Sequence, residues 1–366
     1  MDLDALPLWK ATVDLTIGGS GQEGHGFMDP TALGTDESGR IYVFDPWMRE
    51  VRRFDQRGVF ETVVVGPGDG PGEMPLRPIT FGMADGVIWW WELQTGRIHH
   101  VPISGAEPWR EDTDLTYLRF GTLGLKASPV ELGGPYWVEV AILDSLDTAL
   151  RPSYRVEHLF VQGTSSQVVD RYWTSRGLRF DGGRTLVGYP GPLDQPFGVG
   201  VGRRLLRIDR LRGGEETAAP VRVRLLTETG VSLREAVMWL PPVHLAEGVR
   251  DSIESHIVRG ARLGGSRTIS QATRSRIREF VAAIPERLRA IAEVATGPDN
   301  SVWMELQGRS GQWLVLDSMF EPRAVATVPT NLVSMAYRED GSWWARLRGP
   351  NDLQYVARLT FAEPQS

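Results

Sequence analysis

Short apolar stretches recur along the chain, and each is followed by a turn rich in Asp and Gly. Residues 41–45, 51–54 and 60–65 form one such unit, and residues 87–92 and 98–101 begin another. Runs of this length between Gly, Pro or polar breaks are typical of strands. Ile41 corresponds to Ile88 and Asp45 to Glu92, an offset of 47 residues. This period matches a four-stranded propeller blade.

The same pattern returns near the C-terminus, where Trp303 and Trp344 are 41 residues apart. Asp-Gly and Asp-Asn pairs supply residues that tolerate positive φ in tight hairpin turns. The middle of the chain is less regular. Residues 137–143, 154–161 and 167–173 predict three strands of one divergent blade, and residues 198–201, 204–208 and 221–226 predict strands of the next.

One stretch, residues 247–284, departs from the strand pattern. Ile277, Phe280, Val281 and Ile284 follow helical spacing, Ser270 is a candidate cap, and Pro285 should end the helix. We expect a helical insertion over the edge or face of a blade. A partner-binding helix or a lid is the functional alternative.

The composition narrows the classes of protein. The 366 residues exceed the usual single-domain size, which favours two domains or one repetitive architecture. The chain has no Cys, which excludes disulfides, thiol nucleophiles and thiolate metal sites. The net charge of -6 gives no reason to expect nucleic acid as a partner, and no apolar window is long enough for a membrane span.

The run Gly66-Pro-Gly-Asp-Gly-Pro-Gly-Glu-Met-Pro-Leu-Arg-Pro78 follows the first predicted blade strands. It resembles the signature of a bacterial family of six-bladed β-propellers of uncharacterised function, similar in style to NHL-repeat proteins. The resemblance implies an all-β fold, with residues 1–366 forming one propeller of four-stranded antiparallel blades. It also implies that an N-terminal strand, residues 11–17, closes the last blade beside strands within residues 332–361.

The resemblance also implies a periplasmic or extracellular protein, because members of this family are commonly exported. The N-terminal residues 1–7 contain neither a basic region nor an apolar core, so the chain as written shows no signal peptide. A cytoplasmic location therefore stays open.

Candidate binding residues follow from strand position. Loops between blades, and loops between the second and third strands of a blade, crowd one end of a propeller channel, where function usually lies. On this strand assignment the ligand-binding candidates are His25, Asp45, Arg49, Glu73, Arg77, Trp91 and Glu92. The glycine-rich loop at residues 66–72 lacks the Lys and the helix of a phosphate site, so we expect a rigid connection anchored by Glu73.

Trp89, Trp90 and Trp91 cannot share one face of a strand, because neighbouring side chains alternate. Packing between blades is the expected role, and an aromatic platform for a sugar is the alternative. The six His residues lack the spacing of a zinc site, so no metal is predicted. Calcium stays an alternative cofactor, since isolated carboxylates at strand ends can bind it; the candidates are Asp45, Glu73, Glu92 and Asp317.

Three functions are compatible with this sequence. The leading hypothesis is a non-enzymatic propeller that binds a small molecule, a glycan or a protein, because no compact catalytic motif is present. The alternative is a calcium-dependent hydrolase of the lactonase or esterase type, acting at the mouth of the channel. Recognition of sugar or peptidoglycan is the third, from the aromatic and arginine content.

Overall fold

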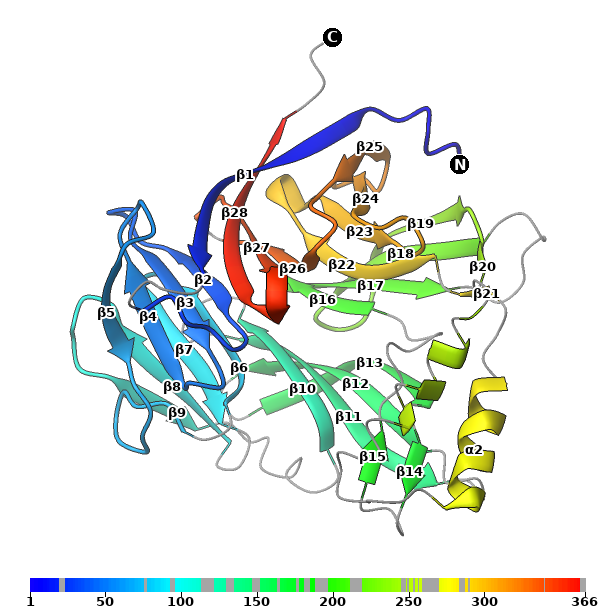
Figure 1. Ribbon diagram of the computed structural model, residues 1–366, viewed down its shortest axis with the longest axis horizontal. Coiled ribbons are helices and arrows are strands. Elements are labelled where there is room, and N and C mark those ends of the chain that lie inside the picture. The colour runs from blue at the N-terminus through cyan, green and yellow to red at the C-terminus, as the bar shows by residue number, and fades with distance from the viewer. Residues whose placement is uncertain are drawn as a thin grey trace.

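The fold is seen in a computed structural model. It describes residues 1–19, 24–75, 78–92, 96–112, 122–129, 135–146, 152–162, 165–175, 178–180, 185–187, 197–210, 219–244, 248, 250–252, 254–255, 257–258, 270–282, 287–288, 290–338 and 340–362. Antiparallel sheets surround a common centre in a propeller-like arrangement (Figure 1). The predicted all-β class is therefore confirmed.

Four sheets each contain four consecutive antiparallel strands. The first consists of β2 (Thr31–Thr35), β3 (Ile41–Asp45), β4 (Glu50–Phe54) and β5 (Phe60–Val65), and the second of β6 (Pro78–Ala84), β7 (Val87–Glu92), β8 (Arg97–Pro102) and β9 (Trp109–Asp112). The third consists of β10 (Thr122–Pro129), β11 (Tyr136–Leu146), β12 (Pro152–Gln162) and β13 (Ser165–Ser175), and the fourth of β16 (Phe197–Val201), β17 (Arg204–Arg210), β18 (Ala219–Thr227) and β19 (Ser232–Leu240). The central strands follow the predicted segments, while β9, β10 and β19 were not predicted from the sequence.

The remaining long strands form one eight-stranded sheet with the order β22-β23-β24-β25-β1-β28-β27-β26. Their bounds are β22 (Ile291–Thr296), β23 (Val302–Leu306), β24 (Gln312–Leu316), β25 (Pro322–Thr327), β26 (Leu332–Tyr337), β27 (Trp343–Arg348), β28 (Gln354–Ala362) and β1 (Leu8–Gly18). Strand β1 pairs antiparallel with β28, which confirms the predicted pairing of residues 11–17 with the C-terminal strands. The described strands thus form four separate blades, one eight-stranded sheet and two small two-stranded sheets, where the sequence predicts six separate blades.

The first strands of the sheets contact one another around the centre of the ring. Strand β6 contacts β2 and β10, and β16 contacts β10 and β22. Strand β22 in turn contacts β26, and β27 contacts β2. These contacts return to the starting sheet, so the ring closes.

The core lies between neighbouring sheets, and the three consecutive Trp residues show how it is built. Trp90 packs with Tyr42 and Phe44 of the first sheet. Trp89 and Trp91 point to the opposite face and pack with Tyr136 of the third sheet. All three indoles are buried, so the predicted packing between blades is confirmed.

The largest departure from the ring is a helical segment beside the third sheet (Figure 1). Helix α2 (Gln271–Ala282) confirms the expected helix, and Ile277 and Val281 form its buried face. Ile284 and Pro285 lie outside the described residues, as does the side chain of Phe280. Short elements complete the chain: β14 (Leu178–Phe180), β15 (Thr185–Val187), β20 (Val243–His244), β21 (Arg287–Leu288), η3 (Pro298–Asn300) and η4 (Pro350–Asp352).

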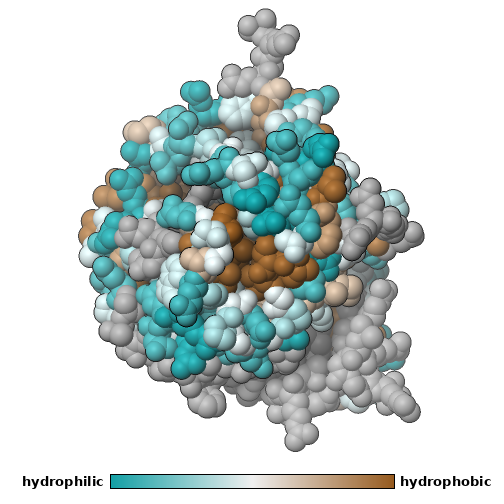
Figure 2. Space-filling model, turned by 90° about the vertical axis from the view of Figure 1, so that its left-hand side faces the viewer, coloured by the Kyte–Doolittle hydropathy of each residue, from teal (hydrophilic) through white to brown (hydrophobic). Residues whose placement is uncertain are grey.

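One side of the molecule carries an apolar patch on its surface. On the side that faces the viewer in Figure 2, hydrophobic side chains gather near the middle and hydrophilic ones surround them. Within the part of the chain that is described, no helix has the length and apolarity required to cross a bilayer.

Candidate functional site

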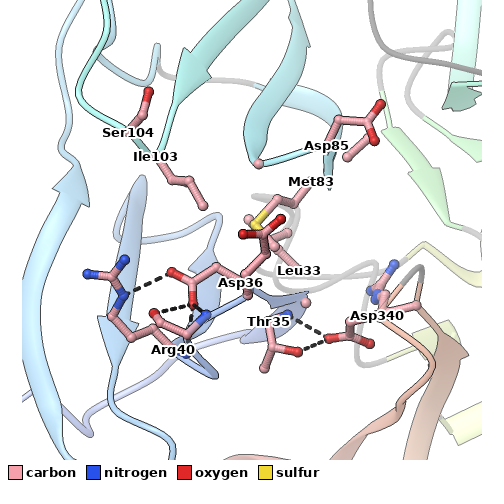
Figure 3. Close-up of a pocket in the computed structure, with 15 residues that line it drawn as sticks. Leu33, Thr35, Asp36, Arg40, Met83, Asp85, Ile103, Ser104 and Asp340 are labelled. Carbon is pink, nitrogen blue, oxygen red and sulfur yellow. Dashed lines mark hydrogen bonds and ion pairs between the residues drawn. The ribbon is translucent and has the colours of Figure 1, made fainter.

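Three hairpin turns from different sheets meet around a cavity at one end of the ring (Figure 3). They are the turns between β2 and β3, between β6 and β7, and between β26 and β27. The cavity has a volume of about 750 Å³, which lies within the range typical of small-molecule sites. Figure 3 shows Asp36, Asp85 and Asp340 approaching from these three turns, with Leu33 and Met83 between them.

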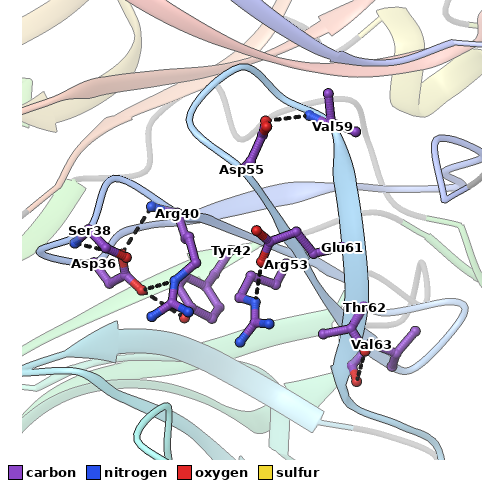
Figure 4. A network of polar contacts seen from close by, with 10 residues as sticks. All are labelled: Asp36, Ser38, Arg40, Tyr42, Arg53, Asp55, Val59, Glu61, Thr62 and Val63. Carbon is purple, nitrogen blue, oxygen red and sulfur yellow. Dashed lines mark hydrogen bonds and ion pairs between the residues drawn. The ribbon is translucent and has the colours of Figure 1, made fainter.

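The β2–β3 turn is held by the carboxylate of Asp36 (Figure 4). Its Oδ1 accepts hydrogen bonds from the backbone N–H of Ser38 (3.0 Å) and of Arg40 (2.9 Å), and its Oδ2 accepts them from Arg40 Nε (2.9 Å) and Tyr42 Oη (3.0 Å). Burial raises the pKa of Asp36, but these hydrogen bonds outweigh it, so the pKa lies below its usual value. Asp36 is therefore a fixed anion at neutral pH.

The same turn chemistry recurs between β4 and β5, where Asp55 Oδ1 accepts hydrogen bonds from the N–H of Arg57 (2.8 Å) and Val59 (2.9 Å). Gly58 adopts φ 81° in that turn, as Gly39 adopts φ 78° in the turn of Asp36. An Asp side chain that accepts from N–H groups two and four residues later, with Gly between them, is thus a repeated hairpin device of this chain. This turn fixes the position of the Asp36 carboxylate without the help of a ligand.

The β26–β27 turn is tied to the end of β2 by Asp340. Its Oδ2 accepts a hydrogen bond from the N–H of Thr35 (2.6 Å) and another from the Thr35 hydroxyl. Its Oδ1 accepts from the N–H of Ser342 (2.9 Å) and from the Ser342 hydroxyl. Residues 305 positions apart in sequence are therefore fixed together at the rim of the cavity.

The third turn is a two-residue hairpin with Asp85 at φ 46° and Gly86 at φ 67°. Two residues with positive φ are the signature of a type I′ turn, which is what the Asp-Gly pair predicts. Asp85 is exposed, and Met83 lies two residues before it in the lining. Gly34 faces Met83 so closely that a Cβ there would lie 3.2 Å from Met83 Cε. The glycine thus permits the close approach of β2 and β6 that forms the cavity floor.

The cavity combines an apolar floor with a charged rim. Leu33, Met83 and Ile103 contribute the apolar surface. Carboxylates, guanidinium groups and hydroxyls from the three turns form the rim, and no His occurs in the described lining. Ser38 Oγ donates to Asp36 Oδ1 at 2.7 Å. A carboxylate with a lowered pKa is a weak base, so this pair is poorly suited to nucleophilic catalysis.

The residues expected from the sequence lie at the opposite end of the same sheets, where β2 and β6 begin and β3 and β7 end. His25 is 6% exposed, and its Nδ1 accepts a hydrogen bond from the N–H of Gly18 at 3.1 Å. Its ring packs edge-on against Phe54. Burial lowers the pKa of His25, so the ring is neutral at pH 7. These contacts give it a role in packing the first sheet against β1.

Asp45 is fully buried and serves the turn that follows β3. Its carboxylate accepts hydrogen bonds from the N–H groups of Met28 (2.6 Å), Trp47 (3.0 Å) and Met48 (3.4 Å). Arg49 closes this turn with φ 56°. Asp45 therefore acts as a turn cap.

Glu73, Trp91 and Glu92 occupy three separate environments. Glu73 Oε2 accepts a hydrogen bond from the N–H of Gly70 at 2.8 Å, which confirms the predicted anchoring of its loop. Trp91 is fully buried in the core, and Glu92 Oε2 lies 3.2 Å from His99 Nε2. Arg77, the remaining candidate, lies outside the described residues. The contacts of the described candidates do not gather them into one site.

The calcium candidates are likewise dispersed. Asp317 Oδ1 accepts from the N–H groups of Met319 (2.8 Å) and Glu321 (3.0 Å), repeating the turn of Asp36 in the eight-stranded sheet. Among the described residues, no group of three or more His, Asp or Glu side chains is placed to hold a metal ion.

The cavity was not predicted from the sequence, because ligand binding was expected at the opposite end of the ring, where propellers usually bind their ligands. A signal was nevertheless present. Three hairpins that connect the first and second strands of their sheets carry Asp36, Asp85 and Asp340 at corresponding positions. Equivalent turns of neighbouring blades lie at one end of a propeller.

Comparisons with known proteins give structural similarity alone. No family model matches the chain, and no curated protein matches it. A gluconolactonase from Xanthomonas campestris is 9% identical, with 95% of this chain and 98% of that chain covered and a TM-score of 0.44. Regucalcin, a calcium-binding protein from Agrobacterium tumefaciens, is 11% identical, with 96% of each chain covered and a TM-score of 0.42. A member of the DUF4221 family from Bacteroides vulgatus is 11% identical, with 97% and 99% covered and a TM-score of 0.42. At these identities and TM-scores the similarity carries no information on activity, ligand or cofactor.

Proposed function

We propose that the protein is a non-enzymatic propeller that binds a small molecule in the cavity at the ends of β2 and β6. The observation that supports this function is the cavity itself, about 750 Å³ in volume, with an apolar floor and polar groups held in place by their own turns. Concave sites of this size with a few fixed polar groups are the usual form of ligand pockets. Because Asp36 and Asp340 are held by several hydrogen bonds each, little ordering is needed when a ligand enters.

Binding is favoured over hydrolysis by the chemistry of the described lining. The hydroxyl of Ser38 has a carboxylate as its partner rather than an imidazole. Asp36 already accepts four further hydrogen bonds, from Ser38 N–H, from Arg40 N–H and Nε, and from Tyr42. Accepting a proton from Ser38 would cost several of these interactions.

The test is a ligand screen with a variant that fills the cavity. Ser104 is exposed and lines the cavity, so Ser104→Trp should block it without disturbing the core. Ser232 is an exposed serine on β19 outside the lining, so Ser232→Trp is the matched control. Small molecules found by ligand-observed NMR should lose binding to Ser104→Trp and keep it with Ser232→Trp. Hits that bind both variants equally would refute this function.

The calcium-dependent hydrolase makes a different prediction, which thermal unfolding can separate. Anything that binds the folded state alone raises its stability by mass action. On our proposal, millimolar calcium and EDTA give the same melting temperature. A large rise with calcium would overturn the metal-free function and favour the hydrolase.

We also propose that the ring contains six blades. The eight-stranded sheet consists of β22–β25 and of β1 with β26–β28. Among the described strands, these halves share hydrogen-bonded strand pairing where residues 8–10 of β1 lie beside residues 325–327 of β25. Each half then has the same four strands as the other sheets, with the N-terminal strand closing the last one. An experimental structure in which β1 and β25 separate would support this count, and one in which all eight strands stay continuous would contradict it.

A further inference from the structure

The charge of the cavity identifies a class of ligand. We propose that the cavity selects an organic cation, an apolar body that carries an ammonium or guanidinium group. The inference rests on the proposed binding function and adds the chemistry of the ligand to it.

The lining of the cavity carries more negative than positive charge. Asp36, Glu37, Asp85 and Asp340 contribute four negative charges, and Arg40 and Arg338 contribute two positive ones. Arg40 Nε lies 2.9 Å from Asp36 Oδ2, so this pair is neutral as a unit. Three carboxylates and one guanidinium group then set the potential of the cavity, which is negative. A concave site lined by one sign of charge raises the local concentration of ligands with the opposite sign.

Two of the rim carboxylates are placed to meet a ligand that enters the cavity. Glu37 and Asp85 are exposed at the tips of two facing turns. Neither side chain has a hydrogen bond or an ion pair within the described residues, so neither must give up a protein partner to meet a cation. Asp340, in contrast, is fixed by Thr35 and Ser342 and adds a constant negative potential.

The apolar floor is an independent observation that requires an organic body. Met83 and Ile103 are half-buried on this floor, beside the buried Leu33. A small hydrated ion would leave this surface without a partner, whereas an alkyl or aromatic group removes it from water at about 25 cal/mol per Å². The floor and the rim together therefore fit an amphipathic cation.

A bare metal ion fits less well. The oxygens of Asp36 and Asp340 are occupied by N–H and O–H donors, which a metal would displace. The described residues also contain no cluster of three or more acidic or His side chains placed to hold a metal ion. The carboxylates act as a charged rim instead of a coordination sphere.

Three probes with one apolar body test the charge preference: 3-phenylpropylammonium, 3-phenylpropanol and 3-phenylpropanoate. We expect the ammonium compound to bind about tenfold more tightly than the alcohol, and the carboxylate most weakly, in ligand-observed NMR titrations at low salt. The preference should shrink as salt is added, because exposed charges are screened.

Substitutions in the rim test whether its carboxylates cause the preference for the ammonium compound. Glu37→Gln with Asp85→Asn should bring the ammonium compound to the affinity of the alcohol and leave the alcohol unchanged. Asp299→Asn removes an exposed carboxylate of another turn that does not line the cavity, so it should preserve the preference. Equal affinity of the three probes, tightest binding of the carboxylate, or no binding of any probe would each overturn the inference. If the Ser104→Trp screen still finds cavity ligands in those cases, the binding function stands and only the cationic class fails.

Discussion

The two faces of the third sheet, β10–β13, pack against neighbouring sheets with different kinds of side chains. One face is apolar and aromatic: Tyr136, Val138 and Leu159 pack with Trp91 of the second sheet. His100 is fully buried on this side and stacked on a Trp ring. Its Nε2 lies 3.5 Å from Glu111 Oε2, but neither ring nitrogen makes a hydrogen bond within the described chain. This face therefore keeps its His neutral.

The other face of the sheet combines an apolar cluster around Trp137 and Phe160 with a buried network of charges. His158 Nε2 lies 3.1 Å from Glu139 Oε2, and its Nδ1 lies 3.4 Å from Asp170 Oδ2. Arg207 of the fourth sheet bridges Asp170 (2.8 Å) and Asp209 (2.8 Å). His158 and Arg207 are 2% and 3% exposed. The charges join two sheets, and their stability depends on every partner being present.

Strand alternation therefore places two different electrostatic environments on the two faces of one sheet. Tyr136 and Val138 face the aromatic side, and Glu139 between Val138 and Val140 faces the ionic side. A single-residue shift in register would exchange the two environments. The two buried His residues should consequently respond to pH in opposite directions.

The largest expected effect is the loss of one charge from the ionic face. Arg207→Met should lower the free energy of unfolding by about 3 kcal/mol, because the half-buried Asp170 and Asp209 lose their shared partner and keep only His158 and Arg224, respectively, as ion-pair partners in the described chain. Urea unfolding at pH 7 measures it. Arg203→Met is the matched control, since Arg203 is half exposed and pairs with Glu228, and it should cost less than about 1 kcal/mol. Equal losses for the two variants would remove the distinction between the two environments.

Acid should destabilise the aromatic face through His100. Burial, reinforced by the neighbouring His99, lowers the pKa of His100 to about 4. The unfolded state binds a proton near pH 6.5, so the stability present above that pH is lost as the pH falls toward 4, by about 3 kcal/mol in total. Urea unfolding from pH 7 to pH 4 should show this slope in the native sequence and a shallower one in His100→Phe. Identical slopes would contradict a neutral, buried His100.

Base should weaken the ionic face through His158. Burial lowers the pKa of His158, but the hydrogen bonds it donates to Asp170 and Glu139 outweigh burial and raise it. Stabilisation by the charged ring is therefore complete below about pH 6.5 and is lost as the pH rises through the raised pKa. His158→Gln should cost about 1.5–3 kcal/mol at pH 6 and progressively less at higher pH. A cost that grows with pH would show that the ring is neutral.

The smallest expected effect is the loss of the Tyr136 hydroxyl from the aromatic face. Tyr136 Oη donates to Glu111 Oε2 at 3.4 Å, a long contact at the margin of the core. Tyr136→Phe should cost about 0.5–1.5 kcal/mol in urea unfolding at pH 7. A loss as large as that of Arg207→Met would mean that the aromatic face also depends on its hydrogen bonds.

Much of the fold could be predicted from local sequence, because hairpin turns and alternation are short-range properties. The opposite faces of Trp89 and Trp90 and the pairing of β1 with β28 follow from such patterns. Strand β10 was missed because its sequence, Thr-Leu-Gly-Leu-Lys-Ala-Ser-Pro, contains few β-branched residues. Its pairing with β11 fixes it as a strand.

The site was harder to predict, because the cavity is formed between sheets. Thr35 and Asp340 meet only after the ring closes, and Gly34 matters only because β2 approaches Met83 of β6. Asp45, in contrast, was expected from the sequence to bind a ligand. An acidic residue at a strand end resembles a ligand in sequence, but here its carboxylate caps a turn.

Crystallographic fragment screening tests most directly which end of the ring binds ligands. We predict that amphipathic amines occupy the cavity between Met83 and Ile103, with the amine toward Asp85. Fragments that gather at the opposite end, around Asp45 and Trp47, while the cavity stays empty would contradict the account.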